Sequence, residues 1–331
     1  MEGKIADSLS FCSLVNFGAV NLSQEEEEFR GDLNREMLSL CKTLPRSMRT
    51  EAALFLMEYL HASFSDGLNF VNYFYAPAWS ILFWLHRSCP DNRKLDPKYV
   101  KDAKTGHTMA MFLHAFDDHL TDGQLPITHL ALLMRTQSWM MMNRAFESLA
   151  RGVEKGAAIV SDFIDDYYSS IGTSDEMESL DSYCALFRKQ MATWLIVPVL
   201  MAKRINANEE FARSVQAVYS SFGIAWRLLD DLQDIEKDMM RGVHSSIYVC
   251  LNRDLRGWWD KDPKKKKDRN KKYVQTILRY VLEKNVIDSI KDRACSELES
   301  AASIAGSCSM SGFADELRCL LRPLRNGENR S

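Results

Sequence analysis

The sequence contains few residues that interrupt helices, since only 15 glycines and 8 prolines occur among its 331 residues. The alternation of apolar and polar residues that is typical of half-buried strands is also scarce. Long segments instead repeat their apolar residues at the period of an amphipathic helix. We therefore predict an all-α fold, and the chain is long enough to form one large domain with an ample core.

The eight cysteines are scattered and none has C-x-x-C spacing. This pattern favours free thiols in a reducing compartment and gives no indication of zinc. No run of about 18 apolar residues occurs, and the N-terminus lacks a basic segment followed by an apolar one. We therefore expect a soluble, cytoplasmic protein without stable membrane insertion.

The chain also lacks a strong excess of either charge, with a formal net charge of −3 at pH 7. Nucleic acid is therefore not an expected partner. The Lys-rich run at 261–272 is interpreted as a solvated loop, and a basic lid or a contact with an anionic membrane is the alternative. We expect an N-terminal lead-in over 1–22, a helical domain over 23–325 and a polar tail over 326–331. Ser23, followed by four glutamates, is typical of the start of a helix that runs to about Lys42.

Residues 222–238 concentrate negative charge on one helix face. The segment has no glycine or proline after Gly223, which predicts one helix. Its helical period places five charged residues within a roughly 100° arc, namely Arg227, Asp230, Asp231, Asp234 and Asp238. Like charges repel at this spacing, and carboxylates facing a core lose hydration. Mg²⁺, which binds one or two carboxylates together with phosphate oxygens, would compensate that cost. A solvated acidic face is the alternative.

A second acidic cluster lies upstream at Asp117, Asp118 and Asp122. Asp118 and Asp122 are one helical turn apart, and Gly123 is expected to end the helix in a left-handed conformation. Two such clusters on two helices could face each other across a cavity and bind a diphosphate through metal ions.

Both clusters resemble known motifs. Asp230-Asp231-Leu232-Gln233-Asp234 has the D-D-x-x-D form of the second aspartate-rich motif of trans-prenyl diphosphate synthases, and residues 222–229 resemble the segment that precedes it there. Pro126-Ile127-Thr128-His129 is similar to the P-T-x-H that follows the first motif, and residues 234–242 resemble the second motif of squalene and phytoene synthases. The chain thus resembles the all-helical class I isoprenoid synthase superfamily over roughly residues 70 to 250.

This resemblance implies a helical bundle around a deep apolar cavity, a prenyl diphosphate substrate, and Mg²⁺ in a three-ion cluster formed with the substrate diphosphate. Homodimers are common in the resembled families, which makes a homodimer a candidate assembly. The implied metal ligands are Asp117, Asp118, Asp122, Asp230, Asp231, Asp234 and Asp238. Of these, Asp118, Asp230 and Asp234 are expected to be catalytic together with Arg227. The cations expected to bind the diphosphate are Arg188, Lys189, Arg227, Lys237 and Arg241.

The expected cavity wall combines aromatic and polar residues. An aromatic helix over 69–87 and a helix from about 176 to 204, kinked at Pro198, are expected to form part of it. The predicted pocket residues are Trp79, Phe83, Leu113, His114, Phe187, Gln190 and Trp226. A ring face stabilises a desolvated cation by about 2 kcal/mol, so some of these side chains would face a carbocation.

Three basic elements of the chain-elongating enzymes are absent or altered. The early Gly-Gly-Lys-Arg-x-Arg-Pro is replaced by Lys42-Thr-Leu-Pro-Arg46-Ser-Met-Arg49, the paired arginines after the first motif are missing, and the Lys of their Lys-Thr-Ala corresponds to Gln190. We therefore favour a terpene synthase that ionises one prenyl diphosphate, cyclises, rearranges or quenches the cation, and releases diphosphate. Chain elongation is the alternative, followed by head-to-head coupling. Outside this class, a helical metal phosphohydrolase and a non-catalytic synthase subunit stay open, although the adjacent His-Asp pair of the former does not occur.

Overall fold

The computed structural model describes residues 15–62, 69–90, 94–171, 177–260 and 270–326. Over these residues the chain is helical and contains no strand, which confirms the predicted all-α fold. Most of the predicted lead-in, most of the Lys-rich run and most of the polar tail lie outside the described residues, and the predicted domain borders stay a prediction. In this part of the chain no single helix has the length and apolar character to cross a membrane. One bent pair, α8 (Leu180–Gln190) with α9 (Ala192–Ile205), meets both criteria when the two helices are taken together.

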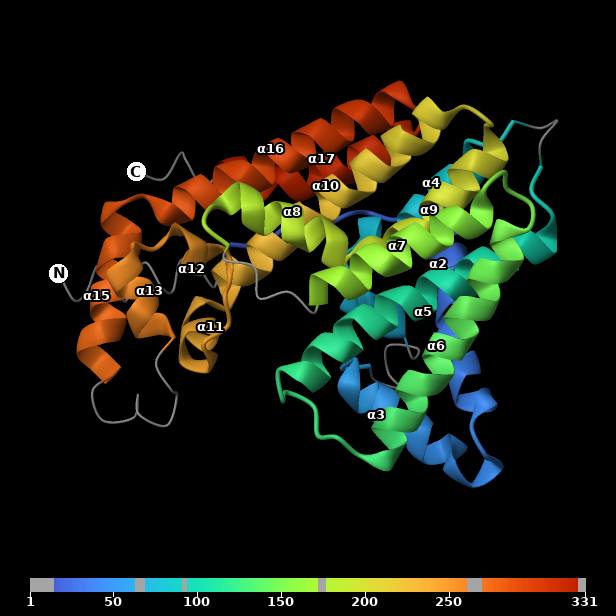
Figure 1. The fold of residues 1–331 in the computed structure, drawn as a ribbon. Coiled ribbons are helices and arrows are strands. Elements are labelled where there is room, and N and C mark those ends of the chain that lie inside the picture. The colour runs from blue at the N-terminus through green and yellow to red at the C-terminus, as the bar shows by residue number, and fades with distance from the viewer. Residues whose placement is uncertain (1–14, 63–68, 91–93, 172–176, 261–269, 327–331) are drawn as a thin grey trace.

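The N-terminal helices pack on one side of the bundle (Figure 1). α2 begins after Ser23, which forms a capping box with Glu26, as the sequence indicates. The predicted aromatic helix over 69–87 is interrupted, because Pro77 has no N–H and fits only the first turn of a helix, so α4 starts anew at Ala76. The bounds are α2 Gln24–Thr43, η1 Arg46–Met48, α3 Arg49–Tyr59, η2 Phe70–Tyr73 and α4 Ala76–Arg87.

The first acidic cluster ends the long helix α5 (Pro97–Thr121). Asp122 is its C-cap, and Gly123 follows with φ of 66°, which confirms the predicted left-handed end. α6 (His129–Ala150) does not begin at Pro126. It begins after Thr128, whose side chain caps the helix by accepting a hydrogen bond from the backbone N–H of Ala131. α7 (Gly156–Ile171) follows.

The helix expected to kink at Pro198 is two helices, α8 (Leu180–Gln190) and α9 (Ala192–Ile205), bent by 65°. The break is at Met191, whose ψ of 9° leaves the helical range. The Met191 side chain packs where a Cβ on Gly223 would come within 2.3 Å of its Cε, so the absence of a side chain at Gly223 makes room for this break. Pro198 lies inside α9 instead.

The predicted single helix over 222–238 is also two helices. α10 (Glu209–Gln233) ends at Asp234, whose ψ of 13° separates it from α11 (Ile235–Arg241). Gly242 then ends α11 with φ of 77°. The remaining helices are α12 Ser246–Cys250, α13 Arg253–Trp259, α15 Asn270–Glu283, α16 Val286–Ser307 and α17 Ser311–Asn326.

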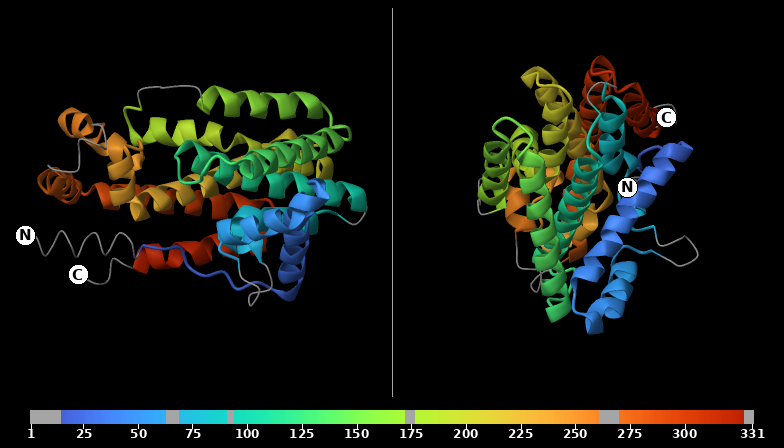
Figure 2. Two further views of the ribbon diagram at one scale, coloured as in Figure 1. Left: turned by 90° about the horizontal axis from the view of Figure 1, so that it is seen from below. Right: turned by 90° about the vertical axis from the view of Figure 1, so that its right-hand side faces the viewer.

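The buried side chains form one continuous core around α10. α10 packs against α9 and α16, α16 packs against α17, and α5 packs against α6. Figure 2 shows these long helices running side by side along the molecule. The ends of α5 and α10, which carry the acidic clusters, are thereby set into a rigid framework.

Candidate active site

The two acidic clusters interact across the space between α5 and α10. The pKa of Asp230 is raised to about 6, chiefly by burial; Arg227 opposes this shift, and the nearby carboxylates Asp231, Asp234 and Asp118 add to it. Asp118 belongs to α5, so the two helix ends lie close enough for a carboxylate on one to raise the pKa of a carboxyl group on the other. The predicted facing of the clusters is therefore present in the structure.

Other carboxyl groups of the site show the same excess of negative charge. Burial raises the pKa of Asp238 to about 8, with Asp231 and Asp234 as further causes. Burial and the neighbouring Asp118 raise the pKa of Asp122. A divalent cation would relieve this repulsion, because it stabilises the ionised form of each carboxyl group.

The carboxylates of this site fit Mg²⁺ only if a bound ligand supplies further oxygen atoms. Among the described residues, no group of three or more His, Cys, Asp or Glu side chains could hold a metal ion. Mg²⁺ accepts one or two protein carboxylates and completes its shell with water and phosphate oxygens. Asp118 and Asp122 on one side, and Asp230 and Asp234 on the other, fit ions that are also bound by a diphosphate.

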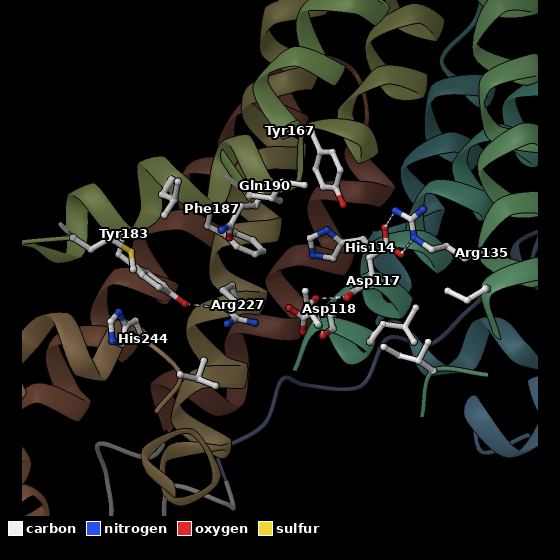
Figure 3. A pocket seen from close by; sticks show the side chains of 18 residues that line it. His114, Asp117, Asp118, Arg135, Tyr167, Tyr183, Phe187, Gln190, Arg227 and His244 are labelled. Atoms are coloured by element: carbon white, nitrogen blue, oxygen red, sulfur yellow. Dashed lines mark hydrogen bonds and ion pairs between the residues drawn. The ribbon is translucent and has the colours of Figure 1, made fainter. Parts of the chain in front are cut away.

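Asp117 and Asp231 have protein partners instead. Asp117 accepts from Nε and Nη2 of Arg135 at 2.7 and 2.8 Å, a bidentate pair that Figure 3 shows at the edge of the cavity. Asp231 is 1% exposed, and its Oδ2 accepts from the backbone N–H of Ser246 at 2.8 Å. These contacts favour a positioning role, and metal binding by these two residues stays a prediction.

Arg227 is the central cation of the site. Its Nε donates to the Tyr183 hydroxyl at 2.9 Å and lies 3.3 Å from Oδ1 of Asp231, while its Nη1 lies 3.6 Å from Oδ2 of Asp230. Its guanidinium is also 5.8 Å from the centre of the Phe187 ring. Arg227 is thereby fixed in orientation beside the acidic residues.

The other predicted cations differ in position. Lys237 donates to Asp234, and Arg241 is close enough to affect the pKa of Asp122. Arg188 instead lies 3.1 Å from Glu297 of α16, and Lys189 is exposed. The structure therefore places Arg227, Lys237 and Arg241 by the acidic clusters, whereas Arg188 is engaged with a residue on another helix.

A cavity of about 680 Å³ adjoins Asp118 and Arg227 (Figure 3). We call it the larger cavity. Three predicted pocket residues, His114, Phe187 and Gln190, line it. Tyr167 of α7 and Arg135 of α6 also line it, and neither was predicted.

Four rings form a cluster beside the larger cavity. His114 lies 4.9 Å from Trp194, Trp194 lies 5.6 Å from Trp226, and Phe187 lies 6.0 Å from His114 (ring centroids). Burial lowers the pKa of His114 to about 4, against the opposing effect of Asp118, so the imidazole is neutral at pH 7. Trp194 is 1% exposed and does not line the larger cavity, so it supports the rings from the core side.

A smaller cavity of about 400 Å³ lies by Asp230. It is lined by Asn72, Tyr73, Phe74, Tyr75, Trp226, Leu229, Asp230 and Gln233. Trp226, predicted as a pocket residue, faces this smaller cavity.

Three predicted pocket residues line neither cavity. Trp79 and Leu113 are 1% and 3% exposed and belong to the core. Phe83 packs against Phe29 of α2, with ring centres 5.7 Å apart. The sequence did not separate these positions from the cavity wall, because α4 is buried over most of its surface.

Comparison with known proteins identifies the fold. No family model matches the chain, and no curated protein matches it. Three solved structures are similar to it over most of both chains. Geranylgeranyl pyrophosphate synthase from Lactobacillus brevis has a TM-score of 0.66 at 13% identity, covering 88% of this chain and 96% of its own. Heptaprenyl diphosphate synthase from Staphylococcus aureus has a TM-score of 0.65 at 11% identity, covering 94% and 100%.

Polyprenyl synthase from Caulobacter crescentus, solved with calcium and isoprenyl diphosphate, has a TM-score of 0.64 at 13% identity and covers 92% of this chain and 98% of its own. Identities this low establish the fold alone. The helix order and these similarities together show that the chain has the all-helical fold of these prenyl synthases.

Proposed function

We propose that this chain is an enzyme that acts on prenyl diphosphates by breaking the bond between the allylic carbon and the diphosphate oxygen. The observation that carries the proposal is the pair of interacting acidic clusters beside a cavity lined with rings. When bound, Mg²⁺ would stabilise the negative charge that develops on the leaving diphosphate. Asp118, Asp122, Asp230 and Asp234 are its proposed ligands, and the similarity to an enzyme solved with calcium and isoprenyl diphosphate supports a metal-bound substrate.

The chain's own cations would orient the diphosphate. Arg227 is held by Tyr183 and two aspartates, so it presents a fixed charge. Lys237 and Arg241 extend from α11 at the same end of the site. Because the substrate diphosphate is anionic, these cationic side chains would bind it through charge-assisted hydrogen bonds.

The ring cluster would stabilise the prenyl cation. His114 is neutral, so it adds no positive charge that would repel a carbocation. Phe187 offers a further ring face to the larger cavity, and Trp194 and Trp226 pack against His114 in the same cluster. A cation near such faces is stabilised by about 2 kcal/mol when it is desolvated.

The comparisons favour transfer of the prenyl group over cyclisation, because the similar structures are prenyl diphosphate synthases. Transfer of the prenyl group to an acceptor is therefore the first candidate for the fate of the cation, with chain elongation as the form of transfer that the sequence offered as its alternative. It replaces the terpene synthase that the sequence alone favoured as the leading hypothesis. The terpene synthase stays the second candidate, since Arg188, one of the expected diphosphate-binding cations, is engaged with Glu297.

The test is an incubation of the purified protein with Mg²⁺ and geranyl, farnesyl or geranylgeranyl diphosphate, with and without isopentenyl diphosphate, analysed by mass spectrometry. We expect consumption of the allylic diphosphate that stops on addition of EDTA. A longer diphosphate would support elongation, and a hydrocarbon or alcohol formed without isopentenyl diphosphate would support the terpene synthase. Metal-dependent consumption of none of the three substrates would overturn the proposed function. Asp162→Asn, an exposed change on α7, is the matched control for changes in the acidic clusters.

A further inference from the structure

The smaller and the larger cavity lie near each other at the end of α10, because Arg227 of the larger one is 3.6 Å from Asp230 of the smaller one. Trp226 lines the smaller cavity, and the next residue, Arg227, lines the larger one. Asp230, one turn further along α10, lines the smaller cavity and interacts with Asp118 of the larger one. Two reactants bound in the two cavities would therefore meet at the acidic clusters, where the carbon–oxygen bond of the prenyl diphosphate is proposed to break.

The smaller cavity is unsuited to a second diphosphate. Of the described residues that line it, none is a lysine or arginine, and its charged side chain is Asp230. A diphosphate placed here would lack side-chain cations from the described lining to balance its charge.

Arg30 is the cation that reaches the rim of this cavity, but its charge is already balanced. Its Nη1 donates to Oδ1 of Asn72 at 2.8 Å, and its Nη2 pairs with Glu27 of the same helix. The guanidinium therefore holds the Asn72 side chain in place.

The walls of the smaller cavity carry several aromatic rings, and their polar groups other than the Asp230 carboxyl are uncharged. Tyr73 contacts Phe74 with ring centres 5.1 Å apart, Tyr75 contacts Phe17 at 4.9 Å, and Trp226 stacks on Trp194 at 5.6 Å. These contacts fix the rings as flat surfaces. Asn72, Tyr73, Tyr75 and Gln233 add amide and hydroxyl groups. Fixed rings with a few neutral hydrogen-bonding groups are typical of a site for an uncharged aromatic ligand.

We propose that the smaller cavity binds the acceptor of the prenyl group, and that this acceptor is an uncharged aromatic nucleophile of the indole or phenol class. This inference rests on the proposed function. In the reaction, the bond between C1 of the prenyl chain and the diphosphate oxygen breaks, and its electron pair leaves with the diphosphate. A ring carbon or heteroatom of the acceptor forms the new bond to C1, and the acceptor's proton passes to the released diphosphate. No oxidant or reductant is required.

The experiment offers the full-length protein Mg²⁺ and each of the three allylic diphosphates with indole, phenol, isopentenyl diphosphate or no acceptor. We expect prenylated indole or phenol, formed at least about tenfold faster than any longer diphosphate. A longer diphosphate without a prenylated aromatic product, or only hydrocarbon or alcohol in every arm, would overturn the acceptor assignment while leaving the proposed function intact. Unconsumed allylic diphosphate in every arm would mean that the proposed function itself has failed.

A variant separates acceptor binding from donor binding. Asn72 is exposed, so Asn72→Arg is compatible with folding and adds a cation at the cavity mouth. We expect the KM for the aromatic acceptor to rise about tenfold and the KM for the allylic diphosphate to stay within about twofold. Asn206→Arg, at the exposed end of α9, is the matched control and is expected to change neither constant. An unchanged acceptor KM in Asn72→Arg would contradict the assignment.

Discussion

Carboxyl groups are buried in two regions of this molecule, with different consequences. Glu316 of α17 is 4% exposed, accepts hydrogen bonds from Ser80 and Trp84 of α4, and faces Glu26 of α2. Burial raises its pKa to about 8. Asp230 is also shifted by burial, to about 6, but it adjoins a cavity and several other carboxylates.

The two regions differ in what surrounds their buried carboxyl groups. At Glu316, residues of three helices surround the side chain, and two of them donate hydrogen bonds to it. A bound proton then neutralises the carboxyl group. At the acidic clusters, the cavity leaves space that a cation and an anionic ligand can occupy. Burial of a carboxyl group therefore indicates a metal site only where open space and further oxygen donors accompany it.

The largest expected effect concerns the acidic clusters. Asp118→Asn or Asp230→Asn should lower kcat/KM for the allylic diphosphate by about 10² to 10³ or more, because stabilisation of the leaving group is lost. The metal-free Asp230→Asn protein should unfold at an equal or higher temperature, since a buried like charge is removed. Steady-state kinetics and calorimetry measure both. Wild-type kinetics in either variant would rule these residues out as ligands, and Asp162→Asn should behave as wild type.

Glu316→Gln tests the buried region around Glu316. The folded-state pKa of about 8 lies above the ordinary value of 4.5, so the folded protein holds a proton that the unfolded chain releases. This group's contribution to stability is thus complete below about pH 4.5 and falls as pH rises towards 8, by up to about 1.4 kcal/mol per pH unit.

In Glu316→Gln this slope should be absent, making the variant more stable than wild type near pH 8. Urea unfolding at several pH values measures the slope. Glu299→Gln, in an exposed pair with Arg325, is the control with little effect. Parallel pH profiles for Glu316→Gln and wild type would show that Glu316 does not hold the proton.

Metal binding at the acidic clusters should strengthen as pH rises, whereas the stability contribution of Glu316 falls. Asp230 and Asp238 have pKa values raised to about 6 and 8, so protons compete with metal ions below these values. Affinity for Mn²⁺ in the presence of pyrophosphate should therefore rise between about pH 6 and pH 8, up to about tenfold per pH unit for each proton released. Titration calorimetry at three pH values would show this, and an affinity independent of pH would count against both residues.

The smallest effect is expected for Arg188, which was predicted from the sequence to bind diphosphate. Because it lies against Glu297, Arg188→Met should change the KM for the allylic diphosphate by less than about threefold and lower stability by about 0 to 1 kcal/mol. Arg241→Met, next to the acidic clusters, should raise that KM more. A larger effect from Arg188→Met than from Arg241→Met would restore Arg188 to the diphosphate site.

Local signals in the sequence were sufficient for the helical fold, the Ser23 cap and the end of α5 at Gly123, because each depends on residues within one or two turns. The break at Met191 was not predictable, since it depends on the fit of that side chain against Gly223 of another helix. Residues 222–238 likewise show a continuous helical pattern, although the chain turns at Asp234.

The acidic clusters were found from spacing alone, but their partners were not. Arg135 is separated from Asp117 by a loop and part of α6, so no local pattern links them. The smaller cavity combines residues of η2 with residues of α10, and its lack of cations became visible only when these segments were brought together. Chemistry that repeats along one helix is readable from sequence, whereas chemistry that depends on packing between helices is not.

The central claim is that the two acidic clusters bind divalent ions together with a diphosphate. Because no described group of three protein ligands is present, the most direct measurement is a Mn²⁺ titration of the protein with and without pyrophosphate, followed by electron paramagnetic resonance. We predict tight Mn²⁺ binding only with pyrophosphate, and loss of that binding in both Asp118→Asn and Asp230→Asn. Equal Mn²⁺ binding in wild type and both variants would contradict the account.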